Sequence, residues 1–395
     1  MVPVMGHPAE SVDHHAGKSS VKLSDLANEL LAQIISYLDN LAPSLTTFKQ
    51  QPGLSLVSSV CTSPLKQTSL VCKRLRRVAL PLLFRNVSLE PCSAVDCLDF
   101  IEQHSLLAHV QSILALPRRS CSHLPSRWWA PLLNALPCTS LTISCAPEAL
   151  QEILGITIGN TDLWAFNMPY HILRLEEGPM SRFSKVPCDS ATNLLMARPW
   201  CSVTVNEGSS LKAYTTYEYF LRQTPSLMSA LLTTKSIDAD ILFRNLSSFS
   251  FVAIFPFYNH VDQILKCVRK MRRLKTLFVK LCPEPESNVL SDEIEDARGH
   301  IEVNDPWNEF ETSYTLITHT VIYLTLEGDL EQFHADDVCM QGIRDHLEQS
   351  VTKRLQQWWL YDGHGCWNKV PSIVAPEAQQ AINSPFVQGT AGLVA

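Results

Sequence analysis

Pairs of apolar residues at positions i and i+2 recur along most of this 395-residue chain. Alternate residues of a β-strand face the same side, so each pair is typical of a short strand with one buried face. The first members of successive pairs are mostly about 30 positions apart, which leaves room for one return helix between strands. The pairs are Leu114 with Leu116, Leu141 with Ile143, Leu173 with Leu175, Val203 with Val205, Phe249 with Phe251, Leu277 with Val279, and Leu324 with Leu326.

This strand-and-return pattern resembles leucine-rich repeats, in which each unit supplies one strand and one helix. The clearest return helix is predicted at residues 261–271, where the apolar residues share one helical face. The resemblance predicts an irregular leucine-rich-repeat-like α/β solenoid over residues 91–370, with loops at 180–193 and 282–307. A set of unrelated α/β elements is the alternative for the same region.

Two amphipathic helices are predicted before that region. In residues 23–41, an apolar residue recurs every four positions from Leu26 to Leu38, which places a broad apolar stripe along one helix. Ser24 or Asp25 is the expected N-cap. A second helix is expected from Leu65 onward, and Pro81 is expected to kink or end it.

The two segments LSDLANELLAQIISYL and SLVCKRLRRVALPLLFRNVSL resemble an F-box of the fungal type. The resemblance implies the following organisation: a disordered leader at 1–20, an F-box-like helical module at 21–90 with an inserted loop at 43–64, the repeat-like region at 91–370, and a disordered tail at 371–395. The fold class expected for the whole chain is therefore α/β, a helical module followed by the solenoid.

An F-box docks a Skp-type adaptor protein, so the resemblance implies a substrate-recognition subunit of an SCF-type cullin-RING ubiquitin ligase. The repeat region would bind a protein client, and the chain itself would not be an enzyme. The adaptor-binding residues implied by the resemblance are Leu26, Leu30, Leu31, Ile34, Leu70, Val71 and Leu75.

Two other functions stay open. Ala27 stands where an F-box usually has proline, and the 43–64 insertion separates the two halves; both favour a leucine-rich-repeat-like scaffold that binds a protein without any ligase role. An enzyme whose catalytic residues are distant in sequence is the third possibility, since such residues assemble only in space.

Charge and composition restrict the classes of partner that the chain is expected to bind. A formal net charge of −7 argues against nucleic-acid binding, and the longest apolar stretches, such as 249–257, are too short to span a membrane. The 13 Cys include no Cys-x-x-Cys pair, so we expect reduced thiols, no metal site, no cofactor and a cytoplasmic or nuclear location.

Three further patterns have two interpretations each. The basic cluster at 73–77 and the acidic run at 292–296 are expected to be solvated faces rather than binding sites. The aromatic residues Trp358, Trp359, Tyr361 and Trp367 are expected to cap the last repeat, with an exposed partner-binding anchor as the alternative.

Overall fold

The computed structural model describes residues 23–39, 48–49, 64–117, 127–159, 161–166, 168–178, 193–234, 237–285, 288, 291–292, 295, 301–302 and 304–370. Contacts divide the chain into two units. We call Met1–Asn40 with Ser63–Leu83 the helical unit, and Leu41–Thr62 with Phe84–Ala395 the sheet unit. The predicted leader at 1–20, the predicted tail at 371–395, the 180–192 part of one predicted loop and most of the predicted 43–64 insertion lie outside the described residues.

In the described part of the helical unit, the short 3-10 helix η1 (Leu23–Asp25) precedes three α-helices, α1 (Asn28–Ser36), α4 (Pro64–Val71) and α5 (Lys73–Leu83). Its core contains Ile35, Leu65 and Ala79. The single helix expected from Leu65 onward is wrong, because Cys72 separates α4 from α5. Pro81 is tolerated near the end of α5, which stops two residues later.

The sheet unit is mixed α/β and is built on a ten-stranded, mostly parallel sheet. Each strand from β1 to β8 pairs with the next along the chain, and β10 lies between β8 and β9. The strands are β1 (Asn86–Leu89), β2 (Ser112–Ala115), β3 (Ser140–Cys145), β4 (His171–Glu177), β5 (Trp200–Ser209), β6 (Ser248–Ile254), β7 (Thr276–Lys280), β8 (Gln332–Ala335), β9 (Trp359–Tyr361) and β10 (Cys366–Lys369). Strand β4 runs antiparallel to both of its neighbours, and β10 does the same at the other end.

One row of apolar residues crosses the sheet in continuous register. Leu141 pairs with Leu175, Leu175 with Val203, Val203 with Phe249, and Phe249 with Leu277. All five are buried. Residues directly opposite each other on paired strands share a face, so this row forms one layer of the core. Five of the seven apolar pairs lie wholly within strands, and Leu114 of a sixth pair lies in β2.

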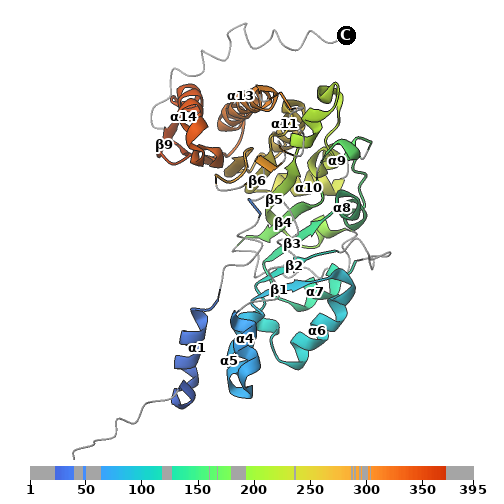
Figure 1. The fold of residues 1–395 in the computed structure, drawn as a ribbon, viewed down its shortest axis with the longest axis vertical. Coiled ribbons are helices and arrows are strands. Elements are labelled where there is room, and N and C mark those ends of the chain that lie inside the picture. Colours follow the sequence, from blue (N-terminus) through green and yellow to red (C-terminus); the bar gives the residue numbers. More distant parts are fainter. Residues whose placement is uncertain are drawn as a thin grey trace, which may run out of the picture. The chain divides into compact units, whose positions relative to one another are not determined.

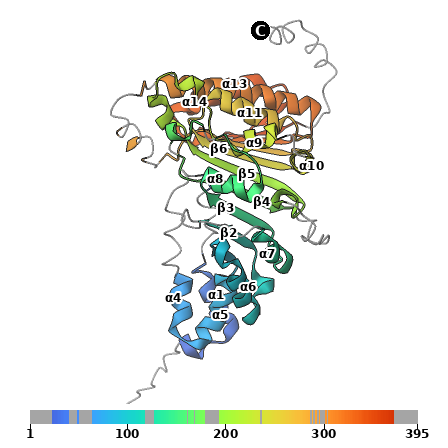
Figure 2. The same cartoon turned by 90° about the vertical axis from the view of Figure 1, so that its right-hand side faces the viewer.

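Successive helices form a second layer along one side of the sheet, as Figures 1 and 2 show for α6, α7, α8, α9 and α11. Neighbours in this layer contact one another: α6 with α7, α8 with α9, α9 with α11, and α11 with α13. The α-helices described in this unit are α6 (Ala94–Gln103), α7 (Trp129–Ala135), α8 (Pro147–Leu154), α9 (Leu227–Thr233), α10 (Ile237–Asn245), α11 (Tyr258–Val268), α13 (Asn304–Glu327) and α14 (Gln341–Leu355). The helix predicted at 261–271 is α11.

One predicted strand position is wrong, and in another strand the predicted core-facing residue is wrong. Leu324 and Leu326 lie in α13, where Val321 and Leu324 are buried on one face of the helix, and the strand that follows is β8. In β2 the core row is continued by Ile113, which pairs with Leu141, so Leu114 faces the other side of the sheet. Strand β1 also lies within the segment assigned to the helical module, but it pairs with β2 and belongs to the sheet.

The aromatic residues near the end of the described chain close the sheet. Trp359 and Trp367 are buried, and the ring of Trp367 stacks on Phe333 at 5.4 Å and on Tyr361 at 4.6 Å between centroids. These contacts favour the capping interpretation over an exposed anchor, because the two tryptophans are not available to a partner.

Candidate functional site

The helical unit exposes many large apolar side chains for its size. Helix α1 has Ala27 as its N-cap, with extended backbone angles and no side-chain hydrogen bond, so the expected cap at Ser24 or Asp25 is wrong. Leu30 and Ile34 lie one turn apart on the helix, and 50% and 45% of their surface is exposed. We define the exposed apolar surface as Leu23, Leu30, Ile34, Tyr37, Leu38, Leu70 and Val71.

The predicted adaptor-binding residues divide into exposed and buried sets. Leu70 and Val71, at the end of α4, are largely exposed, at 70% and 71%. Leu31 is only 1% exposed, and Leu75 packs against the core of the unit. In the folded unit Leu31 belongs to the core, and Leu75 is half-buried against it, so both have a packing role. Their part in adaptor binding stays a prediction. Leu26 is half-buried.

Arg74 links α5 to the start of α1. Its Nε donates to Asn28 Oδ1 at 2.9 Å, and its guanidinium also donates to the carbonyl oxygen of Leu26. The start of α5 is thereby held against the start of α1, only three residues after Val71 in the sequence. This contact fixes α5, which also packs on α4, against the start of α1, and it gives one residue of the basic cluster a structural role.

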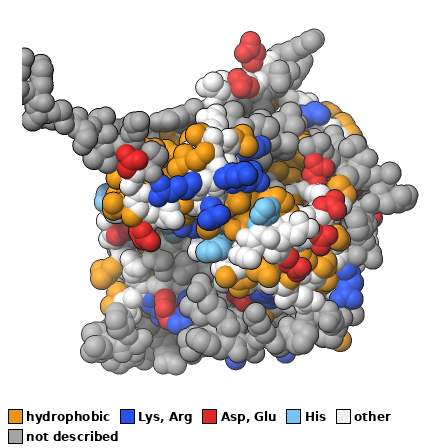
Figure 3. All heavy atoms as spheres, turned by 90° about the horizontal axis from the view of Figure 1, so that it is seen from below, with side chains coloured by type: hydrophobic (Ala, Val, Ile, Leu, Met, Phe, Trp, Pro, Cys, Tyr) orange, Lys and Arg blue, Asp and Glu red, His pale blue; other side chains and the backbone are white. Residues whose placement is uncertain are grey.

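The exposed apolar surface has basic neighbours. Lys66, Lys73, Arg76 and Arg77 occur on α4 and α5, with Lys73 and Arg77 exposed and Arg76 half-buried. Figure 3 shows the same combination of side-chain types, with Lys and Arg lying among hydrophobic side chains on the face seen from below. A surface of this kind suits a protein partner that offers apolar groups with acidic residues around them.

The sheet unit contains a polar pocket of about 520 Å³. It is lined by Thr157, Gly159, Arg222, Gln223, Thr224, Ser226, Ser229, Ala230, Thr233, Asn259, His260 and Gln263. Ser226 and His260 do not bond to each other: both bond to Glu207. The pocket therefore does not show the nucleophile-to-base hydrogen bond of a hydrolase within the described residues.

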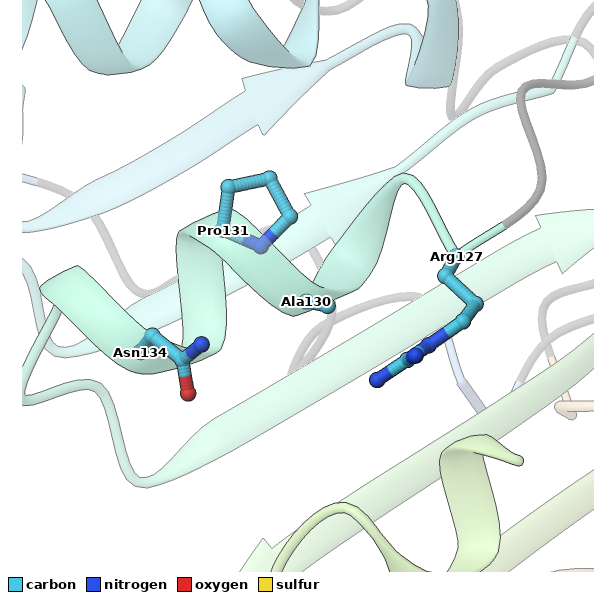
Figure 4. A pocket seen from close by; sticks show the side chains of 4 residues that line it. All are labelled: Arg127, Ala130, Pro131 and Asn134. Atoms are coloured by element: carbon cyan, nitrogen blue, oxygen red, sulfur yellow. The ribbon is translucent and has the colours of Figure 1, made fainter. Parts of the chain in front are cut away.

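A second pocket, of about 510 Å³, lies on α7. Figure 4 shows its described lining, which consists of Arg127 in the turn before the helix and Ala130, Pro131 and Asn134 on the helix itself. The described lining thus comes from one helix and its preceding turn, and the described residues include no opposing element that would enclose a small ligand.

A buried polar cluster, which the sequence patterns did not indicate, lies beside the first pocket. Glu207, at the end of β5, accepts hydrogen bonds from the Ser226 hydroxyl at 3.0 Å and from the Leu227 backbone N–H at 2.8 Å, and thereby fixes the start of α9. Burial alone would raise the pKa of Glu207, but its hydrogen bond with His260, together with the charge of His260, holds the pKa below its usual value.

His171, the first residue of β4, is fully buried nearby. Neither of its ring nitrogens has a hydrogen-bond partner among the described residues. Burial lowers the pKa of His171, since a charged ring would lose its hydration there. The ring is therefore held in its neutral form inside the sheet unit.

The described residues include no group of three or more His, Cys, Asp or Glu side chains placed to hold a metal ion. Among the same residues, no helix has both the length and the apolar character that a membrane span requires. Comparisons of the chain with protein-family models, with curated proteins and with solved structures give no match.

Proposed function

We propose that this chain is the substrate-recognition subunit of an SCF-type cullin-RING ubiquitin ligase. The helical unit would dock a Skp-type adaptor through the exposed apolar surface, and the sheet unit, as an irregular leucine-rich-repeat-like solenoid, would hold a protein client. Such a subunit needs no chemistry of its own, because it acts by raising the concentration of the client near the ligase.

The exposed apolar surface carries this proposal. Leu30, Ile34, Leu70 and Val71 are four of the seven residues that the F-box resemblance implies for adaptor binding, and all four are exposed. Isolated surface leucines need no explanation, but several large apolar side chains on one small helical unit are typical of a protein interface.

The strand order supports the solenoid part of the proposal. From β1 to β8 each strand lies beside the one before it in the chain, as expected when similar units stack one after another. The antiparallel direction of β4 departs from a regular repeat, so the proposed solenoid is irregular.

An adaptor pull-down tests the ligase role. The full chain would be compared with a Leu30→Asp, Ile34→Asp variant, whose substitutions affect exposed positions and leave the core intact. We expect retention of the unmodified chain on a Skp-type adaptor and at least about a tenfold loss for the variant, since a charge buried in an interface costs more than 1.4 kcal/mol.

A matched control is Val95→Asp, which places the same charge on an apolar residue of the sheet unit that is 61% exposed. This variant should be retained like the unmodified chain, and circular dichroism should show all three proteins folded. Equal retention of the unmodified chain and the double variant, or no retention of either, would contradict the ligase role.

The alternative is a protein-binding scaffold with no ligase role. It is favoured by Ala27, which occupies the N-cap of α1 without a side-chain hydrogen bond where an F-box has proline. Under this alternative the exposed apolar surface binds another protein, and the pull-down separates the two functions directly because only the first requires the adaptor.

A further inference from the structure

A short piece of the segment between α1 and α4 lies on the sheet. Phe48 and Lys49 belong to the sheet unit by their contacts. The carbonyl oxygen of Phe48 accepts a hydrogen bond from Asn206 Nδ2 on β5 at 2.6 Å, and its ring lies 6.4 Å from the ring of Phe278 on β7. One main-chain group and one side chain of this piece are therefore both held by the sheet.

The ammonium group of Lys49 contacts a carboxylate and an aromatic ring of the sheet unit. Its Nζ lies 3.1 Å from Asp336 Oδ1 and 4.5 Å from the ring centroid of Phe278. A carboxylate together with the face of an aromatic ring forms a cation site, since both attract positive charge. His334 lies beside the same ring: its imidazole packs edge-on against Phe278, with 5.1 Å between the ring centroids.

The charges beside this site favour a cation. Lys280 is fully buried and pairs with Glu284 at 2.8 Å and with Asp336 at 3.0 Å. These three side chains carry +1 − 1 − 1 = −1, and the positive charge of Lys49, paired with Asp336, balances it. Burial alone would raise the pKa of Asp336, but the charges of Lys280 and Lys49 hold the pKa below its usual value.

The sheet thus offers three matched features in one place: an amide donor for a main-chain carbonyl, an aromatic ring for an aromatic side chain, and a carboxylate for a cation. We infer that Asn206, Phe278, His334 and Asp336 form a recognition site for a protein segment with an aromatic residue followed by Lys or Arg, and that Phe48–Lys49 fills it in cis. A partner segment of the same chemistry binds there only by displacing the chain's own residues.

This inference goes beyond the proposed ligase role and does not depend on the adaptor. The intramolecular segment competes at a high effective concentration because it is tethered to the same chain. The site is therefore closed to weak partners and open to a segment that binds more tightly than Phe48–Lys49, which restricts what the sheet unit recognises.

A peptide-binding measurement tests the inference on the full chain. The probe is a fluorescent peptide with the sequence of residues 44–53, SLTTFKQQPG. Its binding is measured by fluorescence anisotropy while the protein concentration is raised to the millimolar range. We expect a Phe48→Ala, Lys49→Ala variant to bind the probe at least about tenfold more tightly than the unmodified chain, because the competing segment no longer fills the site. A peptide with alanine at both positions should bind neither protein.

The control variant is Lys275→Ala, which removes an exposed lysine that directly precedes β7. Lys275 pairs with Glu331 at 2.9 Å rather than with a residue of the site. The affinity of this variant for the probe should therefore equal that of the unmodified chain. Thermal melting should show that all variants are folded. Equal probe affinity for the double variant and the unmodified chain, no binding at millimolar concentration, or binding of the alanine peptide would each overturn the inference.

Sedimentation distinguishes cis from trans occupancy. An unmodified chain that is monomeric supports the intramolecular assignment. A dimer that dissociates in the Phe48→Ala, Lys49→Ala variant would overturn it in favour of exchange between two copies. A failed adaptor pull-down leaves all of these outcomes unchanged, so the two proposals fail independently.

Discussion

His260 Nε2 lies 2.6 Å from Glu207 Oε2, and the two side chains are 2% and 0% exposed. The pair joins the end of β5 to the first turn of α11, and Glu207 also holds the start of α9. One buried carboxylate therefore fixes two helices against the sheet. A buried pair of this kind is costly to break from one side, because the remaining partner stays in a place where water cannot reach it.

We therefore expect Glu207→Ala to lower the free energy of unfolding by about 3–5 kcal/mol, measured by urea denaturation at neutral pH. The matched control is Glu331→Ala, which removes the exposed pair between Lys275 and Glu331 and should change stability by less than about 1 kcal/mol. A similar small effect for both variants would show that the buried pair does not hold the helices in place.

His171 predicts a pH dependence. Its pKa is lower in the folded chain than in the unfolded chain, so between the two values the unfolded chain binds more protons and stability rises with pH. The contribution is fully present above the unfolded value, near 6.5, and is lost as the pH falls below it. His171→Leu should remove this part of the loss, because leucine carries no proton.

The same variant should be more stable than the unmodified chain at pH 7 by about 1 kcal/mol, since it replaces a buried ring with no hydrogen-bond partner among the described residues. Stability curves of both proteins from pH 7.5 to 5 check this. Parallel curves would show that His171 does not titrate differently on unfolding.

Leu30 and Leu31 separate surface from core on α1. We expect Leu31→Ala to cost about 2–5 kcal/mol, enough to open a unit this small, and Leu30→Ala to change stability by less than about 0.5 kcal/mol. Hydrogen exchange of the α1 amides measures this difference. Equal protection in the two variants would contradict the division of the predicted adaptor-binding residues.

Gly365 predicts a requirement for glycine between β9 and β10. It has a φ of +85°, and a Cβ atom added there would lie 2.6 Å from the carbonyl oxygen of Ala335. Gly365→Ala should therefore lower stability by about 1–3 kcal/mol, measured by thermal melting. Gly342→Ala is the control: no atom lies within 4 Å of its added Cβ, so this helical position should gain up to about 1 kcal/mol.

The sequence patterns predicted the middle of the sheet best. Pairs such as Val203 with Val205 and Phe249 with Phe251 consist of large apolar residues at alternate positions. They lie in strands that pair with other strands of the same pattern. Strand β8 was missed because only Phe333 is a large apolar residue in its four positions. The strand expected at Leu324 is a helix, because the apolar residues around Leu324 fit both a helical and a strand period. Only the length of the segment distinguishes the two.

The candidate sites were less predictable for a physical reason. Leu30 and Leu31 are the same residue type on one helix, so hydrophobicity cannot tell which faces the core; contacts with α5 decide it. The cation site on the sheet combines Lys49, Phe278 and Asp336, which are far apart in the sequence, and no local pattern brings them together. Glu207 and His260 are isolated polar residues whose pairing depends on the register of β5 and the position of α11.

The reversed direction of β4 has a consequence for engineering. Because β4 is antiparallel to β3 and β5, each connection, at 146–170 and at 178–199, leaves and re-enters the sheet at the same end. A tight turn of about two residues would suffice to join such strands, whereas a connection between parallel strands must bring the chain back to the opposite end of the sheet. Most of the length of these two connections is therefore not required to join the strands. A foreign sequence inserted there should spare the buried residues, such as Leu150 in α8 and Leu195, which belong to the core.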